Sequence, residues 1–257
     1  MSSERQPVES AGRWWGEHVH RYNEALLYIG PGDTVLDIAC GTGFGTAIIA
    51  DKTSGKVIGG DIAAEAIEEC RKTWHKSGME FRVLDGTNLD FPDNYFDKVV
   101  SFETIEHTGQ YRKMVAEFAR VLKPGGQLIL STPNREVSSP SGIIVNPFHI
   151  QEFSYDELKE LLETSFRQVQ LSGQRYRRYD KKSLRQRAGR FFEKLFLSFG
   201  IRKLPYNWRS GFMKAFFGYP LYPRETDFIL EKDQLRIKKR MPGPVCRLPK
   251  MKKCPHR

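Results

Sequence analysis

The chain has 257 residues, and its 41 Lys and Arg exceed its 31 Asp and Glu, giving a net charge of +10. This length fits one large domain, or one domain with a sizeable appendage, with a core that needs no disulfide or metal. Hydrophobic residues make up 39% of the chain, which excludes wholesale disorder. No run approaches about 18 apolar residues and the start is polar, so we expect a cytoplasmic protein without a transmembrane helix or secretory signal.

Charge is divided unevenly along the chain. Residues 173–257 hold 24 Lys and Arg against 6 Asp and Glu, a net charge of +18, so residues 1–172 carry a net charge of −8. A strongly basic end favours contact with an anionic surface, either phospholipid or nucleic acid. A solvated basic extension is the alternative.

Short apolar runs alternate with amphipathic segments from residue 13 to residue 171. The first type is typical of buried strands and the second of helices. In chain order, we expect a helix at 13–29, a strand at 34–39, a helix opened by glycines at 41–45, a strand at 56–60, a helix at 63–76, strands at 81–84 and 96–102, a helix at 110–122, a strand at 127–132, a helix at 154–164 with a Ser154–Glu157 capping box, and a strand at 166–171.

This alternation predicts an α/β protein with a doubly wound, mostly parallel sheet. We expect residues 1–172 to form the core, and residues 173–257 a basic, aromatic-rich insertion or extension that caps an acceptor pocket. A last strand near 243–248 would rejoin the sheet as its seventh strand. Apolar residues at 184–199 share one helical face among Arg and Lys, which is typical of core or lid packing, or of docking on an anionic membrane.

The strongest motif is VLDIACGTGFG, in which a strand leads directly into Gly41, Gly43 and Gly45. Glycine allows a tight turn and lets a ligand approach the main-chain N–H groups at a helix N-terminus. The GxGxG spacing differs from the GxGxxG of dinucleotide-binding folds and disfavours NAD.

Acidic residues end the next two expected strands. Asp61 follows Gly43 by 18 residues, where a carboxylate would accept hydrogen bonds from ribose hydroxyls. Asp85 is placed to accept from an adenine amino group. A single acid at a strand end is more often a turn former, but the set together predicts a nucleoside site.

These motifs, with LDGTNLDFPDNYFDKVVSFETIEH and LKPGGQLILSTPN further on, resemble those of class I S-adenosylmethionine-dependent methyltransferases that act on small molecules, such as quinone and sugar O-methyltransferases. The resemblance implies a Rossmann-like methyltransferase fold and S-adenosylmethionine as cofactor. It also implies positions for the cofactor: Gly41 and Gly43 under the methionine part, Asp61 at the ribose, Asp85 and Gly86 at the adenine, Glu103 near the cofactor, and Asp37 bracing the glycine turn.

Ala39 and Arg21 lie close to the expected cofactor site in the sequence motifs. Ala39 stands where the family often has Gly, but because this position need not have a positive φ, we do not expect the alanine to abolish activity. In the opening helix, the resemblance implies that Arg21 reaches the cofactor carboxylate while the helix covers the site. A surface arginine is the alternative.

Candidate catalytic residues follow the fourth expected strand. If Glu103, Glu106 and His107 are helical, they share one face, and His149 from a later loop would converge on them. ExxEH with a later His resembles metal-assisted RNA 2′-hydroxyl methyltransferases, and ExxEH alone resembles quinone-ring O-methyltransferases. Three roles remain open: all four residues holding Mg, Mn or Zn, His107 as a metal-free base assisted by His149 and Glu106, or structural hydrogen bonding.

The expected function is methyl transfer to an oxygen of a small molecule, a glycan sugar or a phenolic or quinone ring. The alternatives are a metal-assisted RNA 2′-O-methyltransferase and a non-catalytic, membrane-associated protein that binds the cofactor. Expected partners are the small-molecule acceptor and an anionic membrane contacted through residues 184–199. RNA is the weaker alternative, because no RNA-binding module is evident.

Overall fold

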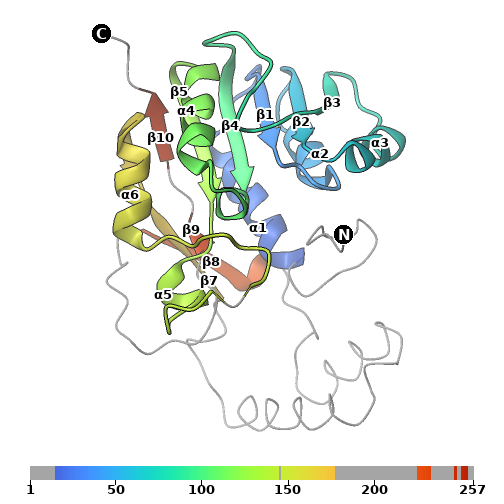
Figure 1. The fold of residues 1–257 in the computed structure, drawn as a ribbon. Coiled ribbons are helices and arrows are strands. Elements are labelled where there is room, and N and C mark those ends of the chain that lie inside the picture. Colours follow the sequence, from blue (N-terminus) through green and yellow to red (C-terminus); the bar gives the residue numbers. More distant parts are fainter. Residues whose placement is uncertain (1–14, 145, 177–224, 233–245, 248–249, 254–257) are drawn as a thin grey trace, which may run out of the picture.

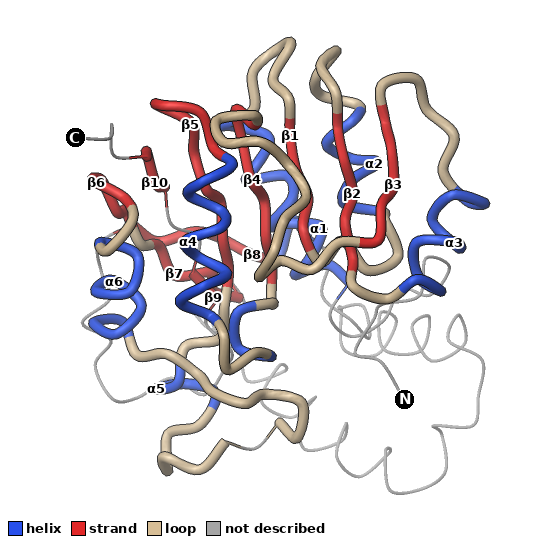
Figure 2. Tube along the Cα trace, turned by 45° about the horizontal axis from the view of Figure 1, so that its top comes forward, coloured by secondary structure: helices blue, strands red, loops and turns tan. Residues whose placement is uncertain are grey.

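The computed structural model describes residues 15–144, 146–176, 225–232, 246–247 and 250–253. Within them, the chain forms a central sheet with helices on both faces and a second, smaller sheet (Figures 1 and 2). The expected amphipathic stretch at 184–199 and most of the expected cap at 173–257 lie outside the described residues. No helix in the described ranges is long and apolar enough to cross a membrane.

The central sheet has the strand order β3-β2-β1-β4-β5-β10-β6. The first five strands in this order are parallel, and β10 is antiparallel to both of its neighbours. The order reverses between β1 and β4, so ligands are expected at the carboxyl ends of these strands. The strands are β1 Val35–Ile38, β2 Val57–Asp61, β3 Met79–Val83, β4 Phe96–Phe102, β5 Leu122–Ser131, β6 Phe166–Gln170 and β10 Lys250–Lys253.

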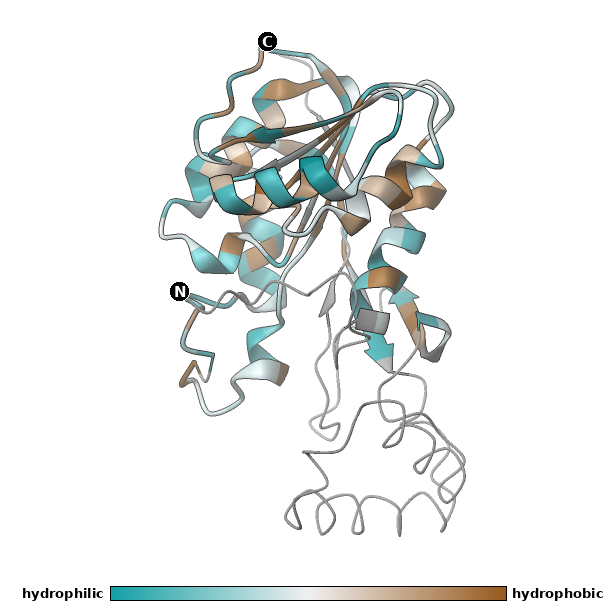
Figure 3. Cartoon of the chain, turned by 90° about the vertical axis from the view of Figure 1, so that its right-hand side faces the viewer, coloured by the Kyte–Doolittle hydropathy of each residue, from teal (hydrophilic) through white to brown (hydrophobic). Residues whose placement is uncertain are grey.

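Consecutive strand residues belong to cores on opposite faces of the sheet. Leu36 and Leu128 pack with apolar residues of α4 and α6, whereas Val35 and Ile129 pack with those of α1 and α2. Burial on both faces explains the continuous apolar strands, which form the hydrophobic layer between helices in Figure 3. The helices are α1 Trp15–Ala25, α2 Phe44–Ala50, α3 Ala64–Thr73, α4 Tyr111–Val121, α5 Arg135–Ser138 and α6 Tyr155–Glu163.

Helix ends follow the sequence signals closely. The predicted capping box of α6 is confirmed: Ser154 Oγ accepts from the Glu157 N–H, and the Glu157 carboxylate accepts from the Ser154 N–H. The opening helix is shorter than the predicted 13–29, because a 3₁₀ turn at Leu26–Tyr28 follows α1.

A second sheet has the order β8-β7-β9, formed by β7 Ser172–Tyr176, β8 Phe228–Lys232 and β9 Cys246–Arg247. The strand predicted near 243–248 to rejoin the central sheet is therefore placed differently. Cys246 and Arg247 pair with the edge of β7, so the strand that enters the central sheet begins only at Lys250. Residues 243–245 lie outside the described ranges.

Candidate active site

The glycine turn links β1 to α2 and places three residues in the left-handed region. Gly41 has φ 56° and Gly43, the N-cap of α2, has φ 76°. Ala39 also has a positive φ, 62°, so the premise that this position needs no positive φ is wrong. This conformation costs an alanine about 1–2 kcal/mol. It is retained because hydrogen bonds fix the next two residues, Cys40 N–H to Gly60 O and Gly41 N–H to Asp61 Oδ2.

The carbonyl groups of the turn face α3 and the residue that ends it. Gly41 O accepts from Cys70 Sγ at 3.3 Å, and Thr42 O accepts from Trp74 Nε1 at 2.9 Å. Both bonds hold the peptide planes of the turn. Thr42 Oγ1 is buried without a hydrogen-bond partner among the described residues, which leaves a polar group of the turn available to a ligand.

Asp61 and Asp85 end β2 and follow β3 at the same edge of the sheet. Asp61 Oδ2 accepts from Gly41 N–H and Oδ1 from Ala63 N–H, and each carboxylate oxygen can accept a further bond. Asp85 Oδ1 accepts two bonds from Thr87, so this residue is also a turn former. Sequence reasoning missed Ile62, an apolar side chain that is 71% exposed directly after Asp61. Its only signal was an apolar residue following a strand-end acid.

Replacing Asp61 with Ala should raise the dissociation constant for S-adenosylmethionine by about 10-fold to 100-fold, because a charge-assisted bond worth about 1.5–3 kcal/mol is lost. Isothermal titration calorimetry measures this change. Asp90→Asn, at an exposed carboxylate, is the control and should leave the constant unchanged. Equal constants for Asp61→Ala and the unaltered protein would mean that another residue holds the ribose.

Asp37 lies behind the glycine turn and is only 1% exposed. Its carboxylate accepts from Thr46 Oγ1 of α2 at 2.6 Å and from Tyr22 Oη of α1 at 3.2 Å. Burial raises the pKa of Asp37 to about 7, although the hydrogen bonds from Thr46 and Tyr22 oppose this shift. The carboxylate thus joins α1 to α2, which agrees with the expected bracing role rather than with contact to a cofactor.

The raised pKa of Asp37 predicts a pH-dependent stability. Between about pH 4 and pH 7 the folded state holds a proton that the unfolded state has released, so this residue's contribution to the free energy of unfolding falls as pH rises. Asp37→Asn removes the cost of burying the charge. Urea unfolding at about pH 5 and pH 8 should show the variant gaining stability relative to the unaltered protein at the higher pH. A difference that is the same at both pH values would contradict this prediction.

Arg21 is 2% exposed, so the alternative of a surface arginine is wrong. Its guanidinium donates to Glu17 Oε1 at 2.6 Å and to Gln174 Oε1 of β7 at 2.8 Å, and it lies 3.8 Å from Glu103 Oε1. Burial, and to a lesser extent the positive charge of Arg21, lower the pKa of His18 to about 3. The His18 imidazole is therefore neutral. Arg21 therefore links α1, the second sheet and the end of β4.

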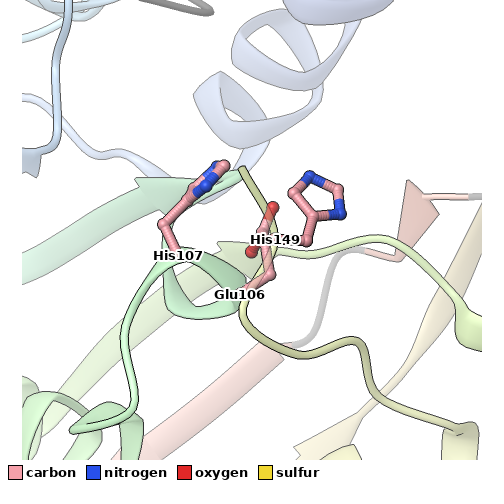
Figure 4. A group of neighbouring side chains, drawn as sticks. All are labelled: Glu106, His107 and His149. Atoms are coloured by element: carbon pink, nitrogen blue, oxygen red, sulfur yellow. The ribbon is translucent and has the colours of Figure 1, made fainter. Parts of the chain in front are cut away.

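Glu106, His107 and His149 converge at the carboxyl ends of β4 and β5 (Figure 4). One potential ligand atom from each lies within 4.8 Å of the others. The convergence of His149, 42 positions after His107, arises because Ile150 N–H and Gln151 N–H both donate to Glu106 O. The two imidazole rings meet edge to face with centroids 5.0 Å apart.

Glu103 does not join this group, so the expectation that ExxEH forms one helical face is wrong. Glu103 has φ 50° and precedes a short 3₁₀ turn, Ile105–His107, instead of lying in a helix. Its Oε1 accepts from Ser131 Oγ at 2.8 Å on the side of Arg21. A left-handed residue before the turn breaks the i, i+3 geometry on which the expectation depended.

Glu106 is fully buried, with Oε2 accepting from Thr132 Oγ1 at 2.8 Å. Oε1 has no hydrogen-bond partner within the described part of the chain. Burial, aided by the charge of Glu103, raises the pKa of Glu106 well above its ordinary value. A buried carboxylate beside two imidazoles is a donor set that a divalent cation of the Zn or Mn type could use.

The sheet order, the glycine turn after β1 and the acids at the next two strand ends agree with the fold that the resemblance to class I S-adenosylmethionine-dependent methyltransferases implies. Residues 36–130 match the family described as Methyltransferase domain. The residues that build the cofactor side of this site fit that cofactor, since they combine a glycine turn, a strand-end carboxylate and an exposed apolar side chain.

Several curated proteins are similar to this chain. It is 37% identical over 153 residues to a "Probable S-adenosylmethionine-dependent methyltransferase" of Mycolicibacterium smegmatis, covering 59% of this chain and 58% of that protein. It is 38% identical over 128 residues to the demethylmenaquinone methyltransferase of Symbiobacterium thermophilum, covering 48% and 50%. The chain thus spans about half the length of these curated relatives.

Solved structures share the fold at lower sequence identity. The YcgJ protein of Bacillus subtilis aligns with a TM-score of 0.57 at 19% identity, over 93% of this chain and 100% of that one. The cyclase SpnF aligns with a TM-score of 0.58 at 19% identity, over 96% and 85%. Because one of these is named a cyclase, likeness of fold does not define the reaction.

Proposed function

We propose that this chain transfers the methyl group of S-adenosylmethionine to an oxygen of a small-molecule acceptor, a sugar hydroxyl or a phenolic or quinone-ring hydroxyl. The observation that carries the proposal is the convergence of Glu106, His107 and His149 at the edge of the sheet that also holds the glycine turn and Asp61.

On the cofactor side, Asp61 would accept from the ribose hydroxyls, and Ile62 would pack against the adenine beside Asp85 and Gly86. Gly41 and Gly43 would lie under the methionine part, with Glu103 and Arg21 nearby. Arg21 is bound by the carboxylate of Glu17, so its contact with the cofactor carboxylate would share the guanidinium with that residue.

When bound, S-adenosylmethionine supplies a methyl group whose bond to sulfur breaks as the acceptor oxygen attacks, with the electron pair left on sulfur. The chain's task is to align the acceptor and remove its proton. His107 Nδ1 lies 2.9 Å from Phe148 O, which can only accept, so Nδ1 carries hydrogen and Nε2 carries the lone pair. In this assignment His107 Nε2 takes the proton from the acceptor hydroxyl.

The same three side chains favour a second way to lower the acceptor's pKa. A divalent cation held by Glu106, His107 and His149 would act as a Lewis acid on the hydroxyl. Because burial raises the pKa of Glu106, binding of a cation there would favour release of a proton from this carboxyl group. Treating the protein with EDTA and then restoring Mg, Mn or Zn separates the two: activity that survives EDTA assigns the step to His107 alone, and activity restored by one metal assigns it to the cation.

The proposal is tested by incubating the protein with methyl-labelled cofactor and a metabolite extract, then identifying labelled products by mass spectrometry. Label on a hydroxyl oxygen supports it. Label on nitrogen would direct the search to amines, as for the phosphoethanolamine N-methyltransferase of Triticum aestivum, which is 34% identical over 118 residues that cover 45% of this chain and 23% of that protein. No binding of S-adenosylmethionine at millimolar concentration would overturn the proposal.

A further inference from the structure

We propose that Glu152 is a positioning residue that sets the tautomers of both histidines, first His149 and then, through Asn146 and Phe148, His107. The inference rests on the proposed function, in which His107 is the base. It follows from one ordered set of hydrogen bonds in the loop that precedes α6.

The set begins at a buried carboxylate. Glu152 is 4% exposed, and its Oε1 lies 2.8 Å from His149 Nδ1. Its Oε2 accepts from Oγ of Ser138, the last residue of α5. An ionised carboxylate can only accept hydrogen bonds, so His149 must carry hydrogen on Nδ1 and the lone pair on Nε2.

The side-chain amide of Asn146 connects His149 to the backbone of Phe148 by two hydrogen bonds. Its Nδ2 lies 2.9 Å from His149 Nε2, and its Oδ1 accepts from Phe148 N–H at 3.0 Å. A peptide N–H can only donate, so the amide orientation of Asn146 is determined independently at each end. The two determinations agree, because the amide NH₂ faces the ring nitrogen that needs a donor.

The set ends at His107. Asn146 Oδ1 holds the backbone of Phe148, and Phe148 O lies 2.9 Å from His107 Nδ1. His149 N–H also donates to Asn146 O, which closes the turn around the amide. The loop is thereby fixed in the position where its carbonyl holds His107 with the lone pair on Nε2.

Glu152 thus fixes the donor and acceptor roles of His149 and Asn146, and Asn146 fixes the position of the Phe148 backbone, whose carbonyl accepts from His107. Without the Glu152 carboxylate, the ring of His149 could exchange its tautomer or rotate. The hydrogen bond from Asn146 Nδ2 to His149 Nε2 would then no longer fix the amide orientation of Asn146. Outer partners that orient an imidazole commonly contribute 10- to 100-fold to activity or metal affinity, and we expect about that range here.

The order gives a test that does not depend on activity. Nitrogen-15 NMR of the imidazoles distinguishes a ring nitrogen that carries hydrogen from one that carries a lone pair. In the unaltered protein, both His107 and His149 should carry hydrogen on Nδ1. With Asn146→Ala, His107 should no longer be held with hydrogen on Nδ1, while His149 should keep its tautomer. With Glu152→Ala, neither imidazole should be held with hydrogen on Nδ1. Glu136→Gln, a carboxylate change at an exposed position of α5, is the matched control and should leave the tautomers of both histidines unchanged.

Activity supplies the second readout. Glu152→Ala should lower kcat about 10-fold to 100-fold with the cofactor dissociation constant unchanged, and Glu152→Gln, whose amide oxygen can still accept from His149, should restore most of it. The inference is overturned if Glu152→Ala or Asn146→Ala leaves His107 in the original tautomer. Absence of methyl transfer with every acceptor would contradict the proposed function instead, while the NMR result would still decide the role of Glu152. Asn146→Ala changes a half-buried loop residue, so it remains decisive if Glu152→Ala fails to fold.

Discussion

Replacing His107 with Asn should lower kcat for methyl transfer by about 10²- to 10⁴-fold, the range that a positioned general base contributes. Asn retains a side-chain N–H that can reach Phe148 O, so the loop geometry is largely kept, but it offers no basic nitrogen to the acceptor. The cofactor dissociation constant should stay within about threefold, because the glycine turn and Asp61 are untouched.

The control variant is His75→Asn, which makes the same substitution at a histidine away from the proposed site. His75 is exposed, and among the residues that the structure describes it bonds locally, to Lys72 O, so its replacement should leave kcat unchanged. Single-turnover kinetics with saturating labelled cofactor measures both variants. Full activity of His107→Asn would refute the assignment of this histidine to proton removal.

Replacing Gly45 with Ala should destabilise the fold by about 3 kcal/mol and weaken cofactor binding severely, because a side chain there meets the ring of Tyr22. An added Cβ would lie 1.8 Å from Tyr22 Cζ. The ring has little freedom to move, since its hydroxyl bonds to Asp37 and it packs edge-on against Phe44 and Phe102. The clash would push α1 away from the glycine turn.

Two further variants separate this clash from a general effect of alanine. Gly32→Ala lies in a left-handed turn with no atom within 4 Å of the added Cβ, so it should cost only about 1–2 kcal/mol of backbone strain and spare cofactor binding. In the double variant Tyr22→Leu with Gly45→Ala, the loss of stability should be smaller than the sum of the single losses. Urea unfolding and calorimetry measure these effects, and strict additivity would mean that the two residues do not meet.

Local patterns were sufficient for much of the fold. The Ser154–Glu157 capping box and the glycines that turn β1 into α2 depend on interactions within a few residues, and the apolar runs of the strands can be recognised within a short window. The acids at the ends of β2 and β3 were also predictable, because parallel strands place their carboxyl ends at one edge of the sheet. These features predict the cofactor side of the site at the carboxyl ends of β1, β2 and β3.

The sequence by itself therefore determined the class of fold, the glycine turn and the strand-end acids. Only the tertiary structure decided that Arg21 is buried against Gln174, that Glu103 leaves the ExxEH group through a positive φ, and that Glu152 lies behind His149. The physical reason is separation along the chain. Each of these outcomes depends on partners brought together by loop docking or on one backbone dihedral, and periodicity within a segment carries no information about either.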